Sequence, residues 1–277
     1  MPLKQDGMTP KELLPRCIIV DRSNKLALNA VSLSGPGLEF LLDTGRWQAR
    51  TDNFFISLMS LAPTPEARLN EATEKFLMLS RRKREFKGSF GIQYHLSCPN
   101  GGLNPLELVA EAVPILEKAD RILPPDVPFF YKFGPDLHHI AARRIMAHRR
   151  CDGLVIFNSM QFGTHPIWAH TPPVDWKKLF GTDDPRESPM AKRFPGFAGG
   201  LSGAPLFPFL LEWLNKAREV DTTDKHIQVG GGLFSTEAID AVRKAGADSV
   251  AVVGSGIFID PLGMPRLIHH ALNQSWG

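Results

Sequence analysis

The feature that most constrains the fold is a pair of glycine-rich turns near the end of the 277-residue chain. One apolar run leads into three glycines at 230–232, and a second leads into Gly-Ser-Gly at 254–256. Between them, Ser235 can cap a helix, and Gly246 stands where a helix-terminating glycine belongs. The pattern predicts two successive buried parallel strands joined by a helix, each strand ending in a turn without bulky side chains.

Turns of this kind at this place favour phosphate binding. In (β/α)8 barrels, the loops after the last two strands often form a phosphate site, and a following helix N-terminus attracts an anion. The chain after Phe258 suffices for one closing helix over 265–274, so the two strands stand where the last pair of a barrel belongs. The alternative is two ordinary strand-to-helix turns in which glycine only relieves crowding.

The length and the order of the other segments predict one domain, an α/β (β/α)8 TIM barrel over residues 1–277. A hairpin at 17–30 is expected to plug the bottom of the barrel. The eight strands are expected at 25–30, 53–59, 89–96, 127–133, 154–157, 196–200, 227–229 and 249–253. Residues 160–195 predict a long loop or lid, because an irregular segment of that length in a compact domain usually encloses a site.

Composition excludes several other classes of protein. The net charge of +3 is small and dispersed, which argues against nucleic-acid and membrane partners. Three cysteines do not make a disulfide framework, and the N-terminus carries no signal-peptide or membrane-span pattern, so a cytoplasmic location is expected. The histidines at 138, 139, 165 and 170 have no carboxylate or cysteine at metal-ligand spacing, so no metal site is expected.

Three strand ends carry polar residues that suggest chemistry. Lys132 stands in an otherwise apolar run and either snorkels out of the barrel or points at an anion. Cys98 lies in a loop of Pro, Asn and Gly, the alternative being a small buried hydrophobic residue. Asn158 and Ser159 follow the fifth strand, the alternative being a helix cap.

Six motifs in this order resemble the dihydroorotate dehydrogenase family, over about residues 26–258. They are Leu96-Ser97-Cys98-Pro99-Asn100, Lys132, Asn158-Ser159, Gly199-Gly200-Leu201-Ser202-Gly203, Gly230-Gly231-Gly232 and Gly254-Ser255. The resemblance implies an FMN-binding barrel that oxidises dihydroorotate to orotate in pyrimidine synthesis. Cysteine in the third-strand loop is typical of the soluble class of the family.

The resemblance also implies a role for each matched position. Cys98 would be the general base that removes a proton while hydride passes to the flavin. Asn100, Asn158 and Ser159 would bind the substrate. The positions implied to hold FMN are Ser34, Gly35, His95, Lys132, Gly199, Gly200, Gly230, Gly231, Gly232, Gly254 and Ser255.

The chain departs from the family on the substrate side. A lysine usually follows the second strand, where this chain has Leu58 or Met59, and the strand-three motif begins with His95 rather than asparagine. The loop after the second strand also lacks the family's substrate-side asparagine. Two alternatives therefore stay open: a different cyclic amide or alkene substrate, and a flavin-binding protein with little activity. A homodimer and an electron-transfer partner subunit are the associations that the resemblance admits.

Overall fold

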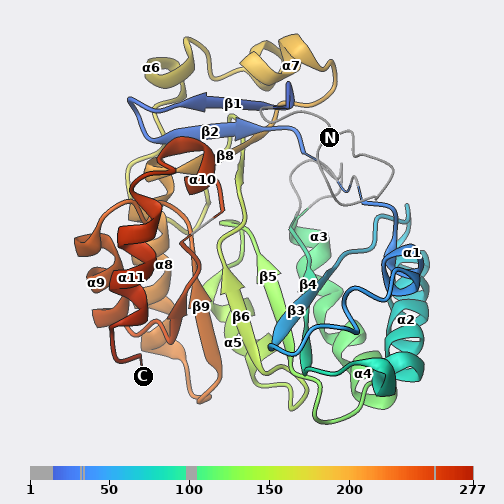
Figure 1. The fold of residues 1–277 in the computed structure, drawn as a ribbon. Coiled ribbons are helices and arrows are strands. Elements are labelled where there is room, and N and C mark those ends of the chain that lie inside the picture. The colour runs from blue at the N-terminus through green and yellow to red at the C-terminus, as the bar shows by residue number, and fades with distance from the viewer. Residues whose placement is uncertain (1–14, 32, 34, 98–104, 253, 277) are drawn as a thin grey trace.

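The computed structural model describes residues 15–31, 33, 35–97, 105–252 and 254–276, without the side chains of residues 105 and 106. Its centre is a curled sheet of six parallel strands (Figure 1). In spatial order they are β10 (Ser249–Val250), β9 (His226–Val229), β6 (Gly153–Ile156), β5 (Phe129–Phe133), β4 (Phe90–His95) and β3 (Phe54–Leu58). The described strands form a half-barrel whose margins are β3 and β10.

Helices pack on the outer face of this sheet (Figure 1). They are α2 (Pro65–Arg82), α3 (Pro105–Ala110), α4 (Ala112–Ile122), α5 (His139–Met146), α8 (Phe207–Val220), α9 (Thr236–Lys244) and α11 (Met264–Leu272). Helix α9 has the ends that the sequence predicts: the Ser235 hydroxyl accepts the Ala238 N–H at 3.1 Å, and Gly246 has a φ of +93°. The turns that precede and follow α9 are thereby fixed by local sequence.

A second, antiparallel sheet lies across the C-terminal ends of the parallel strands (Figure 1). It has the order β1 (Ile18–Asp21), β2 (Leu26–Asn29), β8 (Gly200–Gly203) and β7 (Met160–Gln161). The hairpin expected at 17–30 is confirmed as β1 and β2. Its expected place at the bottom of the barrel is wrong, because β2 pairs with β8 at the opposite end.

Two of the eight expected barrel strands belong to this second sheet. The segments at 25–30 and 196–200 contribute to β2 and β8, and β9 pairs directly with β6. A parallel neighbour of β6 needs a substantial crossover helix. The chain between β6 and β8 offers only α6 (Trp176–Phe180) and α7 (Pro189–Arg193), of five residues each, whereas the 14-residue α8 precedes β9.

The fold also contains three shorter helical segments. They are α1 (Leu38–Asp43), η1 (Lys83–Glu85) and α10 (Gly256–Ile259). The expected loop at 160–195 contains β7, α6, η2 (Pro185–Glu187) and α7, and it buries Phe162, Trp176 and Met190. Glu212 of α8 accepts the N–H groups of His170 and Thr171, each at 2.8 Å, which ties this segment to the half-barrel.

The concave face of the sheet has an aromatic floor. The rings of Phe55 and Phe130 lie 5.0 Å apart, and Phe130 lies 5.6 Å from His226. Two glycines leave room for these rings, because a Cβ at Gly91 would stand 2.6 Å from Phe55 and one at Gly153 would stand 2.5 Å from Phe130. Phe55 is 46% exposed, so solvent reaches the concave face.

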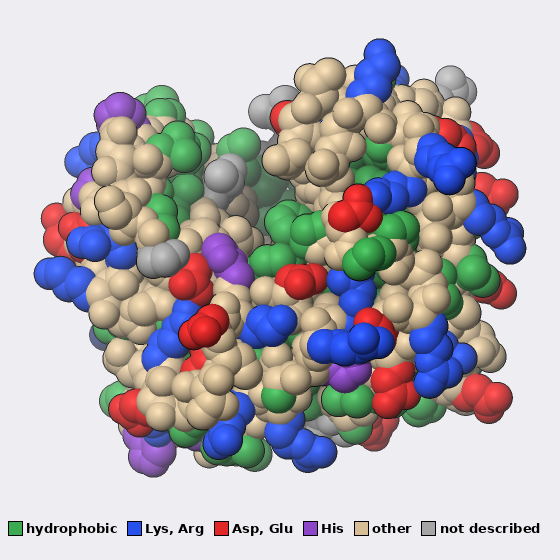
Figure 2. Space-filling view, turned by 90° about the horizontal axis from the view of Figure 1, so that it is seen from below, with side chains coloured by type: hydrophobic (Ala, Val, Ile, Leu, Met, Phe, Trp, Pro, Cys, Tyr) green, Lys and Arg blue, Asp and Glu red, His purple; other side chains and the backbone are tan. Residues whose placement is uncertain are grey.

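The molecule seen from below is hollowed between two lobes, and its basic and acidic side chains are intermixed (Figure 2). This face therefore carries no uniform charge. Within the described ranges, no helix combines the length and the apolar character needed to cross a membrane.

Candidate functional site

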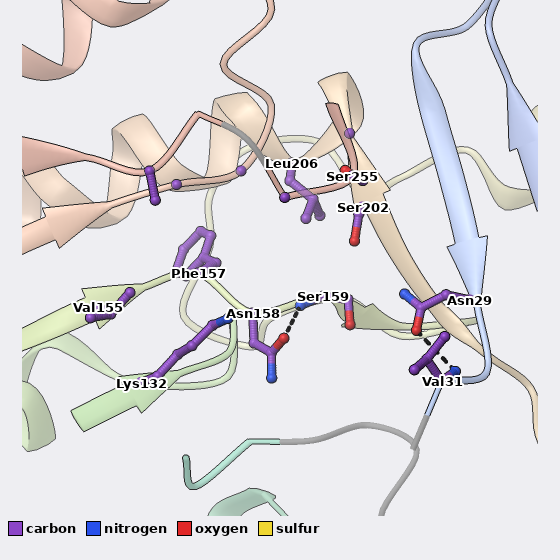
Figure 3. A pocket seen from close by; sticks show the side chains of 15 residues that line it. Asn29, Val31, Lys132, Val155, Phe157, Asn158, Ser159, Ser202, Leu206 and Ser255 are labelled. Atoms are coloured by element: carbon purple, nitrogen blue, oxygen red, sulfur yellow. Dashed lines mark hydrogen bonds between the residues drawn. The ribbon is translucent and has the colours of Figure 1, made fainter. Parts of the chain in front are cut away.

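A pocket of about 260 Å³ lies where the C-terminal ends of β5, β6 and β9 meet the second sheet (Figure 3). Its lining joins elements that are far apart in sequence. The lining residues are Asn29, Val31, Lys132, Val155, Phe157, Asn158, Ser159, Ser202, Gly203, Leu206, Gly230, Gly231, Ala251, Gly254 and Ser255. Ligand sites in open parallel sheets form at this end of the strands.

Lys132 reaches the pocket because β5 alternates in burial. Phe129, Tyr131 and Phe133 pack against the helices, which leaves Phe130 and Lys132 on the concave face. Figure 3 shows the Lys132 side chain directed toward Asn158. The structure thus places the lysine on the pocket wall and does not support the alternative in which it snorkels outward.

Asn158 is fixed by side-chain hydrogen bonds at the end of β6. Its Oδ1 accepts the Ser159 N–H at 3.0 Å, and its Nδ2 donates to the Ser97 carbonyl at 3.0 Å. The helix-cap alternative is wrong, because the chain continues into β7. The bond to Ser97 holds Asn158 against the end of β4, next to the start of the cysteine loop.

The two glycine turns differ in what requires the glycine. Gly232 has a φ of +75°, and a Cβ there would stand 2.6 Å from the Phe207 backbone nitrogen. Gly230 is also crowded by protein, with the Ala251 carbonyl at 2.8 Å from an added Cβ. Gly254 lines the pocket, and an added Cβ would meet nothing within 4 Å. Crowding relief thus explains Gly230 and Gly232, whereas Gly254 borders open space.

Several residues expected at the site do not line this pocket. Gly35 is exposed, Gly199 and Gly232 pack against protein, and Gly200 and His95 contribute to strands. Three others, Ser34, Cys98 and Asn100, lie outside the described residues.

The sequence reasoning missed the contribution of the second sheet. Asn29, at the end of β2, donates its Nδ2 hydrogen to the Gly200 carbonyl at 3.1 Å and accepts the Val31 N–H at 3.3 Å. Ser202 and Leu206 come from β8 and the turn η3 (Ala204–Leu206). Asn29 carried a usable signal, a polar residue at a strand end, but its partner strand could not be identified from the sequence.

The strands next to β5 carry uncharged hydrogen-bonding groups near Lys132, outside the pocket lining. His95 is the register partner of Lys132, and its Nε2 lies 2.7 Å from the Ser57 hydroxyl and 3.2 Å from the Gln93 amide oxygen. Burial, with the nearby Lys132 charge, lowers the pKa of His95 to about 3. His95 is therefore neutral at physiological pH.

The two positions at which the family's lysine is expected hold buried apolar side chains. Leu58 and Met59 are 5% and 6% exposed and are buried in the core. Ser57 is the residue at this end of β3 that reaches the concave face. Ser57, one residue before them, contacts the His95 ring from β3.

The lining suits a flavin mononucleotide, whose parts are a planar ring and a terminal phosphate. Val155, Phe157 and Leu206 provide apolar surface, and Lys132 provides a cation at one end of the pocket. Gly231, Gly254, Ser255 and Ser202 leave backbone and hydroxyl groups at the other end, without side-chain bulk. Within the described chain, no cluster of three metal-binding side chains occurs.

Comparison with known proteins gives one consistent family name. A curated dihydroorotate dehydrogenase (quinone) from Sinorhizobium fredii is 30% identical over 152 residues, which cover 53% of this chain and 35% of that protein. The chain thus spans about a third of that relative's length. No protein-family model matches the chain.

Solved structures with the same fold carry the same family name. Ligand-free DHODH from Eimeria tenella aligns with a TM-score of 0.64 at 20% identity, covering 95% of this chain and 75% of that one. The complex of the same enzyme with ferulenol aligns with a TM-score of 0.62 at 19% identity, covering 98% and 72%. These neighbours show a TIM-barrel-like α/β fold, of which the described chain forms a six-stranded half-barrel.

Proposed function

Because the chain is a relative of the dihydroorotate dehydrogenases, as its motifs predict, we propose that it is an FMN-dependent oxidoreductase acting on a CH–CH bond. One observation supports this most: a single pocket joins Lys132, Asn158 and Ser159 to the glycine turns at 230–231 and 254–255. These segments are separated by up to about half the chain, so their convergence does not follow from local sequence. The oxidation of dihydroorotate to orotate is the reaction that the relatives' name implies.

In this proposal, different residues of the pocket bind different parts of the cofactor. Gly230, Gly231, Gly254 and Ser255 hold the phosphate through backbone and hydroxyl groups, and Gly199 and Gly200 support that end through the second sheet. Lys132 lies at the pyrimidine edge of the ring, where its charge stabilises negative charge. Bound FMN would supply the hydride acceptor.

The substrate side of the proposal rests on the loop that follows β4. Cys98 removes the proton, since a free thiol has a pKa near 8.5 and needs modest help to act as a base at neutral pH. Asn100, Asn158 and Ser159 orient the planar substrate. Ser34, Gly35 and His95 complete the surroundings of the flavin in this assignment.

The first test is the visible spectrum of the purified protein, with and without added FMN. We expect a yellow protein with flavin absorption, and a chain that binds no FMN would overturn the proposal. Lys132→Met should weaken FMN binding about tenfold to a hundredfold, the effect of losing a charge-assisted contact. Lys178→Met removes an exposed lysine of α6 and serves as the matched control.

The second test separates an enzyme from a flavin-binding protein. Anaerobic mixing with a reducing substrate should bleach the flavin, and Cys98→Ala should abolish bleaching while FMN stays bound. Bleaching at an unchanged rate in Cys98→Ala would remove Cys98 from the mechanism. A wild-type flavin that no cyclic dihydro-amide bleaches, and that no activated alkene reoxidises after chemical reduction, would favour the binding protein.

The same proposal implies binding partners and a cellular location for the protein. A small-molecule substrate is required, and a homodimer and an electron-transfer subunit are proposed associations in the cytoplasm. The curated relative's name gives quinone as its acceptor, whereas Cys98 resembles the soluble class. Steady-state assays with fumarate, NAD, quinone and dye acceptors would distinguish these acceptors.

A further inference from the structure

Ser202 lines the pocket from the second sheet and has no part in the proposed function. Strand β8 pairs with β2 so that Leu201 lies opposite Leu28. Both leucines are fully buried, and neighbouring residues of a strand point to opposite faces of a sheet. The Ser202 hydroxyl therefore lies on the face that carries Asn29, which is the face that borders the pocket (Figure 3).

The backbone that follows Ser202 is held in place by the hairpin. Gly203 has a φ of +116°, and an added Cβ would stand 2.7 Å from the Leu26 Cα. The Ala204 N–H donates to the Lys25 carbonyl at 2.8 Å. The close approach of β2 thus fixes the position of Ser202 on the pocket wall.

Ser255 reaches the same end of the pocket from the parallel sheet, and Lys132 lies at the other end (Figure 3). The Ser255 carbonyl accepts the N–H groups of Phe258 and Ile259, at 3.0 and 3.2 Å, which fixes the turn between β10 and α10. Helix α10 packs against β1 and β2. The hairpin therefore contacts both elements that carry the two serines, α10 and β8.

Two hydroxyl groups at one end of a pocket suit a phosphate, because each can donate a hydrogen bond to a negatively charged oxygen. We propose that Ser202 is a further cofactor-binding residue, and that the FMN phosphate bridges Ser202 of the second sheet and Ser255 of the parallel sheet. The inference rests on the proposed function, which assigns the phosphate to the turns at 230–231 and 254–255. Binding of the phosphate then ties the hairpin to the half-barrel.

The test compares FMN with riboflavin, which has the same ring but no phosphate. Both are titrated into the flavin-free protein, and binding is followed by the change in flavin fluorescence. Ser202→Ala is expected to weaken FMN binding about tenfold or more, the effect of losing a hydrogen bond to a charged group, and to leave riboflavin binding unchanged. An equal loss for the two flavins, or no loss for either, would overturn the inference.

Two further variants separate the hydroxyl from effects on folding. Ser202→Thr retains the hydroxyl and is expected to keep most of the preference for FMN over riboflavin. Ser89→Ala removes an exposed serine at the opposite end of the parallel sheet and should change neither affinity. A folded Ser202→Thr variant that loses the preference as fully as Ser202→Ala would overturn the assignment to the hydroxyl.

Hydrogen exchange at saturating flavin tests the bridge between the sheets. FMN is expected to slow exchange at 26–29 and 200–203 several-fold more than riboflavin does, because its phosphate holds the two sheets together. Ser202→Ala should remove this difference. Equal slowing by the two flavins in the wild-type protein would show that the phosphate does not join the sheets.

These outcomes are distinct from failure of the proposed function. A protein that binds neither flavin fails the proposed function before any variant is compared. A protein that binds and reduces FMN, but whose flavin affinities are insensitive to Ser202→Ala, keeps that function and loses only the phosphate bridge.

Discussion

Arg68 and Glu111 form a buried ion pair that joins α2 to the N-cap residue of α4. Arg68 is 3% and Glu111 9% exposed. Arg68 donates two hydrogen bonds to the Glu111 carboxylate and a third to the Ala62 carbonyl, at 2.8 Å. The hydrogen bond with Glu111 raises the pKa of Arg68 above its ordinary value. The close contact between the two side chains compensates for the burial of both.

Removing one member of this ion pair should destabilise the fold. We expect Arg68→Ala to lower the free energy of unfolding by about 3–5 kcal/mol, because Glu111 is left as a buried unpaired charge. Urea unfolding measures the loss. Arg81→Ala, on the exposed side of the same helix, should change stability by less than about 0.5 kcal/mol. A loss below about 1 kcal/mol in Arg68→Ala would show that water compensates Glu111.

The turns after β9 and β10 allow a matched pair of glycine substitutions. Gly232→Ala should destabilise the fold by about 1–3 kcal/mol, because its backbone is left-handed and Phe207 occupies the Cβ position. Gly254→Ala should leave stability nearly unchanged, since its Cβ meets nothing, yet weaken FMN binding. Thermal unfolding and FMN titration separate the two effects. Unchanged FMN affinity in Gly254→Ala would move the phosphate away from that turn.

Glu212 holds the segment 160–195 through hydrogen bonds that depend on its charge. Burial raises the pKa of Glu212, but hydrogen bonds from Thr171, His170 and Lys216 outweigh this and bring it to about 2. The contribution to stability is therefore complete above the ordinary pKa of 4.5 and is lost as the pH falls toward 2.

Proteolysis is the readout for this tether. Glu212→Ala should make cleavage within residues 160–195 several-fold faster at pH 7. The exposed Glu219, on the same helix, provides the control as Glu219→Ala. Cleavage of Glu212→Ala at the wild-type rate would show that the buried Trp176 and Met190 hold the segment without Glu212.

An element could be predicted from the sequence where the residues that determine it lie close together in the chain. The hairpin and α9 were predictable, because turn residues and caps act within a few positions. The pairing of β8 with β2 was not, since Leu28 and Leu201 meet only through tertiary contact. For the same reason Lys132 and Asn158 were predictable as strand-end residues, whereas Asn29 was not.

At the scale of the whole molecule, the parallel sheet formed by the described residues has two margins where a closed barrel is expected. In that part of the chain β4 and β5 have neighbours on both sides, whereas β10 pairs with β9 alone, over two residues. Hydrogen exchange should therefore be at least about a hundredfold slower in 90–95 than in 249–251, an opening difference of about 2.7 kcal/mol. Equal protection from hydrogen exchange in the two segments would mean that another part of the chain covers β10. Added FMN should slow exchange at 249–255 and leave 90–95 unchanged.

In the aromatic floor, the rings of two phenylalanines occupy the space beside two glycines. Gly91 and Gly153 leave the space that Phe55 and Phe130 occupy, and a methyl group at either glycine would overlap a ring. A larger residue at position 91 must therefore be matched by a smaller one at position 55. At Gly153 the backbone carbonyl of His226, 2.4 Å from an added Cβ, requires glycine whatever residue stands at position 130. Among homologues, positions 55 and 91 should therefore vary in concert, with a small residue at one accompanying a large residue at the other, whereas position 153 should stay glycine.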